Sequence, residues 1–115
     1  MNDLSNIKTK KTPIKIAGEE KYLHYNLNAF AELEEIYGTI DAAMNELSKG
    51  SVKSIINILR AGLLHENEKL TAKKVGEMFD LSEISYIGER INTAISQAMP
   101  EANENEEQGT DSKKK

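Results

Sequence analysis

Two segments in the second half of the chain carry large apolar residues at the three- and four-residue spacing of an α-helix. The apolar positions of the first segment are Val52, Ile55, Ile56, Leu59 and Leu63. Those of the second segment are Ile84, Ile87, Ile91, Ile95 and Ala98, with Gly88 on the same stripe. Residues at this spacing share one face of a helix, and that face can be buried. The pattern predicts a mainly α-helical fold in which Ser51 and Ser82 cap these two helices.

Three shorter helices are predicted from the residues at their ends. Asn26 or Asn28 can cap the first helix, and Gly38 ends it because glycine tolerates the left-handed conformation. The second helix has its apolar residues within positions 40–47, and Thr71 caps the third. Together with the two longer segments, this gives about five helices in one small bundle.

A β-hairpin is predicted between Thr12 and Tyr25, before the first helix. Apolar and polar residues alternate around Ile14 and Ile16, and residues 17–20 supply the turn. An isolated hairpin is only marginally stable in water. We therefore expect it to pack on the helices or on another chain.

The folded domain is expected to span residues 13–100. Residues 1–12 are polar and basic, and we expect them to form a flexible N-terminal arm. Residues 101–115 hold five acidic residues and end in three lysines, 113–115, without a large apolar residue. Such a segment cannot bury enough surface to offset its ordering entropy, so a disordered charged tail is predicted.

The charge and composition of the chain disfavour several classes of protein. Between Tyr22 and Met99 there are eleven acidic residues against seven Lys and Arg, a balance that does not attract phosphate backbones. The chain has no cysteine, which excludes disulfides and thiolate metal sites. We find no pattern typical of a signal peptide or a membrane span. We therefore expect a cytoplasmic protein that binds neither nucleic acid nor membrane.

No constellation of residues predicts catalysis, a cofactor or a metal. The two histidines, His24 and His65, lie far apart in the sequence, and His65-Glu66 lacks the second histidine of a zinc-protease helix. We expect His65 to interact with a helix end or with solvent. Three glutamates, at positions 32, 34 and 35, fit a solvated helix face better than a catalytic pocket. We predict that the protein is not an enzyme.

Residues 70–99 have the order of elements of a helix-turn-helix, which is the alternative functional hypothesis. In that case a small DNA-binding or regulatory module would use Lys73, Lys74 and Arg90. The second helix, however, places Glu89 directly before its one base, and a carboxylate facing phosphates opposes binding. Two helices packed together for structure alone are the preferred interpretation.

Some apolar residues fall outside the main helical stripes, namely Ile58, Leu64 and Tyr86. They can belong to the core through a second helix face, or they can form a patch for a partner or a second copy of the chain. Gly62, inside a predicted helix, costs about 1 kcal/mol relative to alanine, and close approach of a neighbouring element would compensate. Ile58, Leu64 and Tyr86 are the candidate partner-binding residues.

Residues 14–81 resemble one known family, the tail assembly chaperones of long-tailed phages and gene transfer agents. The segments that carry the resemblance are Asn26–Glu35 (NLNAFAELEE) with Tyr37-Gly38, and Arg60–Asn67 (RAGLLHEN) with Leu70-Thr71 and Val75-Gly76-Glu77. Members of the family often carry a cysteine or a tryptophan in the two matching helices, and this chain has neither.

The resemblance implies a non-catalytic role in phage or prophage tail morphogenesis. Such proteins bind the tape measure protein, and tail proteins including tube subunits, in the cytoplasm of the bacterial host. They leave the assembled tail and are not expected in the mature virion. The family often makes a longer product by frameshifting near the end of the gene. The codons of Lys113–Lys115 are a candidate site for it, and a solubilising tail or a cloning remnant is the alternative interpretation of these lysines. The apolar residues outside the stripes suit helix-in-groove binding and are also compatible with a homo-oligomer.

Overall fold

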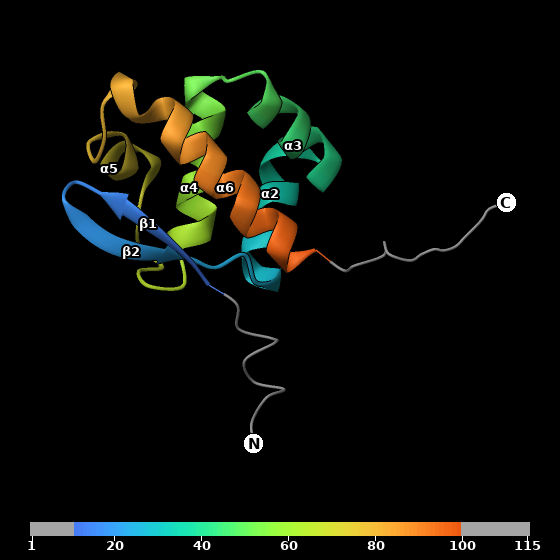
Figure 1. Ribbon diagram of the computed structural model, residues 1–115. Coiled ribbons are helices and arrows are strands. Elements are labelled where there is room, and N and C mark those ends of the chain that lie inside the picture. Colours follow the sequence, from blue (N-terminus) through green and yellow to red (C-terminus); the bar gives the residue numbers. More distant parts are fainter. Residues whose placement is uncertain (1–10, 100–115) are drawn as a thin grey trace, which may run out of the picture.

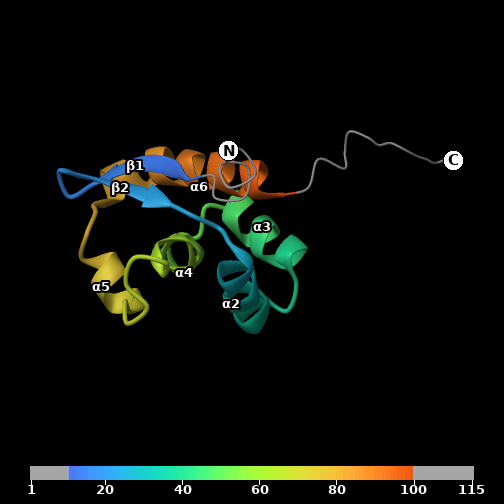
Figure 2. The same ribbon diagram turned by 90° about the horizontal axis from the view of Figure 1, so that it is seen from below.

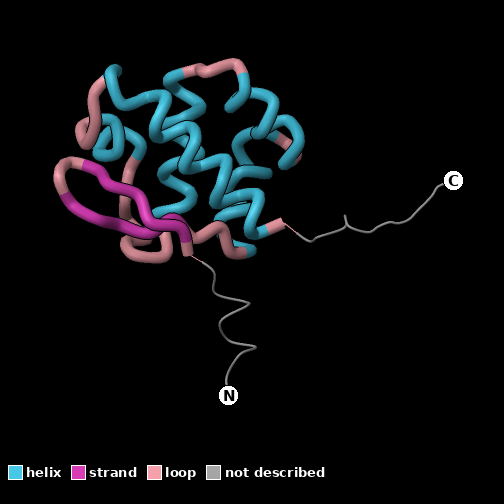
Figure 3. Tube along the Cα trace, in the orientation of Figure 1, coloured by secondary structure: helices cyan, strands magenta, loops and turns pink. Residues whose placement is uncertain are grey.

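The computed structural model describes residues 11–99. Two strands are followed by five α-helices and one 3-10 turn (Figures 1 and 3). In chain order they are β1 (Thr12–Ile16), β2 (Glu19–Leu23), α2 (Leu27–Tyr37), α3 (Ile40–Ser48), α4 (Val52–Leu63), α5 (Ala72–Gly76), η1 (Leu81–Glu83) and α6 (Ile84–Ala98). This confirms the prediction of a mainly helical fold with an N-terminal hairpin.

The hairpin is antiparallel and its two-residue turn is Ala17-Gly18. Ile16 pairs with Glu19, and both turn residues have positive φ, 56° for Ala17 and 77° for Gly18. Positive φ at both central residues matches the right-handed twist of the flanking strands. The side chains of β1 alternate between buried and exposed, and the buried set includes Thr12. Thr12 therefore belongs to the strand and not to the predicted arm.

The helix ends follow the predicted capping residues, with one exception. Asn26, not Asn28, caps α2, and its side chain accepts a hydrogen bond from the Ala29 amide at 2.9 Å. Gly38, Ser51 and Thr71 occupy the predicted positions.

The prediction that Ser82 caps the last helix is wrong. Ser82 lies inside η1, a 3-10 turn that leads directly into α6. Asp80 precedes this turn, and its backbone amide donates a hydrogen bond to Glu83 Oε1 at 2.8 Å. Because Asp80 and Glu83 form a capping box across the extra turn, the helical path begins earlier than the apolar stripe indicates.

Helix α4 is the centre of the domain. It contacts α2, α3, α5, α6 and β2, while β1 packs on α6. In Figure 2, α6 and the hairpin form an upper layer, and α5, α4 and α2 lie beneath it. The largest fully buried side chains are Ile14, Ile16, Leu23, Leu33, Ile55, Ile58, Leu59, Val75, Ile87, Ile91 and Ile95.

Gly62 of α4 is in close contact with the ring of Tyr25. This is the close approach of a neighbouring element that was predicted to compensate for a glycine inside the helix.

Among residues 11–99, no helix is both long and apolar enough to cross a lipid bilayer. The predicted charged tail, residues 101–115, and positions 1–10 of the predicted arm lie outside the described residues.

Candidate functional site

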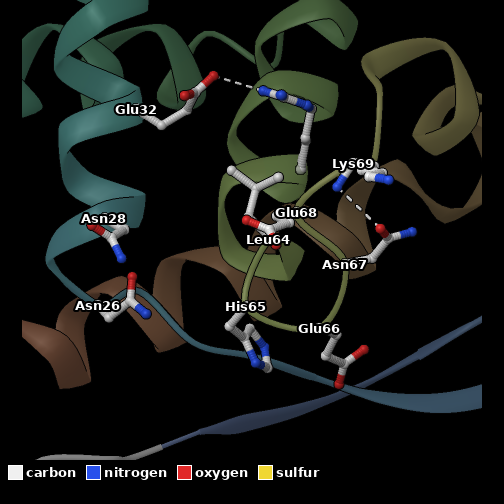
Figure 4. A pocket seen from close by; sticks show the side chains of 10 residues that line it. Asn26, Asn28, Glu32, Leu64, His65, Glu66, Asn67, Glu68 and Lys69 are labelled. Carbon is white, nitrogen blue, oxygen red and sulfur yellow. Dashed lines mark hydrogen bonds and ion pairs between the residues drawn. The ribbon is translucent and has the colours of Figure 1, made fainter.

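A hollow of about 820 Å³ opens between α2 and the end of α4, and we call it the α2–α4 groove (Figure 4). Its lining is polar apart from one leucine. The lining residues are Asn26, Asn28, Glu32, Arg60, Leu64, His65, Glu66, Asn67, Glu68 and Lys69. The groove therefore brings together two segments that are about thirty residues apart in the sequence.

An ion pair joins the two sides of this groove. Arg60 Nη1 on α4 donates a hydrogen bond to Glu32 Oε2 on α2 at 2.7 Å, and Figure 4 shows Glu32 pointing across towards α4. Arg60 Nε also donates to the Leu70 carbonyl oxygen at 2.7 Å. One guanidinium thus ties α2, α4 and the segment before α5 together. Its planar fork can serve two acceptors in fixed directions.

The expectation that Glu32 shares a solvated face with Glu34 and Glu35 is wrong for Glu32. Glu34 and Glu35 are exposed, whereas the Glu32 side chain is partly buried and paired. A sequence signal for this pair exists in Arg60, because it is the one charged residue in the apolar run Ile58–Leu64, and an arginine drawn out of water there requires an acceptor. The sequence does not indicate which carboxylate supplies it.

The structure also brings the two histidines together. The His24 and His65 ring centroids are 5.3 Å apart in an edge-to-face arrangement, and His65 Nε2 lies 2.8 Å from the Tyr22 carbonyl oxygen. Burial lowers the pKa of His24, and the neighbouring His65 and Lys11 lower it further. The prediction for His65 was a helix end or solvent; the structure shows a contact with a strand carbonyl instead of a helix end, and the ring is partly exposed. Within residues 11–99, no three His, Cys, Asp or Glu side chains cluster as a metal site would require.

The three predicted partner-binding residues lie in different environments. Ile58 has no exposed surface, so the folded chain does not offer it to a partner. The expectation was wrong because α4 is surrounded by other elements, and residues outside its main stripe are therefore also core. Leu64 is partly buried and lines the α2–α4 groove. Tyr86 is 42% exposed, and its hydroxyl accepts a hydrogen bond from the Lys15 amide at 2.9 Å.

The basic residues of the alternative DNA-binding hypothesis lie on two different helices. Lys73 and Lys74 are exposed on the short helix α5. Arg90 Nη1 donates to the Pro13 carbonyl oxygen at 3.0 Å, which links α6 to β1. The side of α6 that carries Arg90 is thus covered by the hairpin.

Comparisons with models of protein families, with curated proteins and with solved structures found no match to this chain.

Proposed function

We propose that this protein is a phage tail assembly chaperone, which binds the tape measure protein during tail morphogenesis without catalysing a reaction. One observation carries the proposal: the residues that resemble the family come together in space. Eight of the ten residues that line the α2–α4 groove fall within segments 26–35 and 60–67, which carry the resemblance. The two segments that carry the resemblance thus share one surface, and this supports the proposal.

The chemistry of the groove supports binding in preference to catalysis. Its arginine is occupied by Glu32 and by the Leu70 carbonyl, and the other lining groups are mostly amides and carboxylates. Such groups hydrogen-bond to polypeptide backbone and side chains. Leu27, between the lining residues Asn26 and Asn28 in sequence, is 85% exposed, and an exposed leucine offers apolar contact to a partner.

Co-expression tests the proposal. The full chain is produced together with the tape measure protein of the same phage, and soluble tape measure protein is measured with and without the chain. We expect the tape measure protein to become soluble and to purify with the chain. Failure of both effects would contradict the proposal.

A second measurement separates the proposal from the DNA-binding alternative. An assembly chaperone is expected to leave the mobility of double-stranded DNA unchanged at low salt. Salt-sensitive binding that is weakened in the variants Lys73→Ala and Lys74→Ala would instead favour the regulatory module. Mass spectrometry of purified virions is expected to find no copy of the chain, which distinguishes a chaperone from a structural subunit.

A further inference from the structure

The hairpin is a sheet of two strands, so each strand has one outer edge. The residues that flank its two-residue turn exchange hydrogen bonds, and bonded and non-bonded pairs alternate along an antiparallel sheet. The pairs Lys15–Glu20 and Pro13–Tyr22 are therefore non-bonded pairs, whose N–H and C=O groups point away from the neighbouring strand. An edge with free groups of this kind can pair with a strand of another chain.

Helix α6 closes the outer edge of β1. The Lys15 amide donates a hydrogen bond to the Tyr86 hydroxyl at 2.9 Å, and Arg90 Nη1 donates to the Pro13 carbonyl oxygen at 3.0 Å. Because proline has no N–H, the Lys15 amide is the outward donor of β1, and it is occupied. Figure 2 shows α6 alongside the hairpin in the upper layer, and α6 packs on β1. A further strand therefore has no access to β1.

The outer edge of β2 is open. In Figure 1, β1 lies between α6 and β2, so β2 is the outer strand. Within residues 11–99, the amides of Glu20 and Tyr22 donate no hydrogen bond to a group outside the hairpin. Both residues are exposed, and the Tyr22 carbonyl oxygen lies 2.8 Å from His65 Nε2. One edge of the hairpin thus keeps the backbone groups that a further strand would use.

One residue of β2 breaks the alternation of buried apolar and exposed polar side chains. Lys21 pairs with Ile14, which is buried, so the Lys21 side chain lies on the core side of the sheet. It lines a small hollow of about 70 Å³, to which Leu63, Leu70 and Met78 also contribute. An apolar residue would suit this position at least as well. Packing within the domain therefore does not explain the lysine.

The Lys21 ammonium stays in contact with water and with an acidic neighbour. Lys21 Nζ lies 3.5 Å from Glu19 Oε1, and the Lys21 side chain is 27% exposed. A lysine can bury its stem against apolar surface while its charge remains hydrated. A strand added to the edge of β2 would cover this region and draw the charge out of water. An inward-facing charge on an edge strand therefore opposes strand addition.

Pairing of β2 with β2 of a second copy would also bring like charges together. In the antiparallel register that joins Glu20 of one copy to Tyr22 of the other, the two-fold axis passes through Lys21. Lys21 then lies directly opposite Lys21 of the second copy. A register centred on Glu20 sets two glutamates opposite each other instead. Like charges in directly opposite positions destabilise a pair of strands.

We propose that Lys21 protects the outer edge of β2 from pairing with β2 of a second copy, and that Glu20 contributes to this protection. The second copy is the partner because it offers the same open edge in a register that matches donors to acceptors. This inference goes beyond the proposed function and does not depend on it. It concerns contact between identical chains and assigns a role to a charge that the core does not require.

Lys21→Val is the sharpest test. Valine favours strands and suits the apolar hollow, so we expect the variant to fold. The matched control is Lys15→Val, which removes the same charge from the strand whose edge α6 covers. Hydrogen exchange of the Glu20 and Tyr22 amides is followed by NMR at about 0.05 mM and about 1 mM protein. At the higher concentration, we expect exchange to slow by at least about tenfold in Lys21→Val and by less than about twofold in the wild type and in Lys15→Val.

Two further variants make the test independent of folding and of side-chain size. Lys21→Arg keeps the charge on a side chain of similar length, and we expect it to behave as the wild type. Lys21→Thr removes the charge with a smaller residue that also favours strands, and it replaces Lys21→Val if circular dichroism shows that the valine variant is unfolded. Sedimentation equilibrium gives the mass of each variant, and we expect a dimer for the uncharged variants.

Each other outcome overturns the proposal. Equal exchange in Lys21→Val and the wild type at both concentrations would show that the lysine does not protect the edge. Slower exchange of the wild type at the higher concentration would show that β2 pairs in spite of the lysine. Equal association of Lys15→Val would assign the effect to the loss of charge and not to the edge. None of these results bears on the co-expression test, so failure of the chaperone function remains distinguishable.

Discussion

The ring of Tyr25 lies directly on Gly62, where the chain between β2 and α2 crosses α4. A Cβ atom built on Gly62 would stand 2.6 Å from Tyr25 Cζ and 2.8 Å from its hydroxyl oxygen. The same hydroxyl donates a hydrogen bond to the Ile58 carbonyl oxygen at 2.7 Å. Burial raises the pKa of Tyr25, so the phenol stays protonated as this bond requires. The glycine therefore allows a strand-to-helix connection to pack on the central helix.

Gly62→Ala is expected to destabilise the fold by about 1–3 kcal/mol, although alanine is the better helix former. The Tyr25 ring is 3% exposed and cannot move aside without disturbing the core. The free energy of unfolding in urea measures the effect. The matched control is Gly88→Ala, where a Cβ meets open space, and we expect that variant to gain up to about 1 kcal/mol. Equal effects at the two positions would contradict the close contact.

Tyr25→Phe removes the buried hydroxyl while it keeps the ring. We expect a loss of about 1 kcal/mol, the net value of one hydrogen bond. Tyr22→Phe is the control, because the Tyr22 hydroxyl bonds to exposed Glu20 at 3.2 Å and the loss of this bond should cost close to zero. Urea unfolding distinguishes the two variants. A stability of Tyr25→Phe equal to the wild type would show that the bond to Ile58 contributes nothing.

The Glu32–Arg60 pair is expected to show measurable coupling in a double-mutant cycle. Glu32→Gln, Arg60→Gln and the double variant should give a coupling energy of up to about 1 kcal/mol, because both side chains are partly buried. The exposed pair Glu46–Lys49 serves as the reference and should give less. Unfolding at two salt concentrations provides the check. Coupling at Glu32–Arg60 no larger than at the exposed pair would contradict its role as a link between α2 and α4.

Local rules predicted most of the helix ends and strands, because the residues that cap or turn the chain act on their near neighbours. Asn26, Gly38, Ser51 and Thr71 each form a local hydrogen bond or adopt a backbone conformation that their type favours. Ser82 was assigned wrongly because a serine and an aspartate two residues apart can both serve as a cap. Periodicity alone does not decide between them.

The contacts of the candidate site could not be predicted in the same way, because they join residues far apart in the chain. Nothing near Arg60 shows that its acceptor is Glu32, and nothing near His24 points to His65. Ile58 was misjudged for a related reason, since its burial depends on how many elements surround α4. Periodicity gives the faces of one helix, whereas the number of its neighbours is a property of the whole fold.

Ala17 is expected to limit the stability of the hairpin. Its φ of 56° lies in the left-handed region, which costs a residue with a Cβ about 1 kcal/mol. Asparagine tolerates this conformation, and Asn-Gly is the preferred pair for such a turn. We expect Ala17→Asn to stabilise the fold by about 0.5–1 kcal/mol, measured by thermal unfolding. Ala31→Asn on the exposed face of α2 is the control and should destabilise slightly, because its backbone is helical. The same sign at both positions would argue against the left-handed turn.

The stability of the fold is expected to fall in mild acid through His24. Burial, then His65, then Lys11 lower the pKa of His24 below its ordinary value of 6.5, so the unfolded chain binds a proton more readily than the folded one. The contribution of neutral His24 to the free energy of unfolding is therefore complete above pH 6.5, and it is lost as the pH falls through the pKa of His24 in the folded state.

His24→Gln should remove this part of the pH dependence, so the free energy of unfolding of the variant should change less between pH 7.5 and 5.5 than that of the wild type. Urea unfolding at each pH measures the difference, and NMR titration of the His24 ring gives the pKa directly. Parallel pH profiles for the two proteins, or a ring that titrates at or above 6.5, would contradict the prediction.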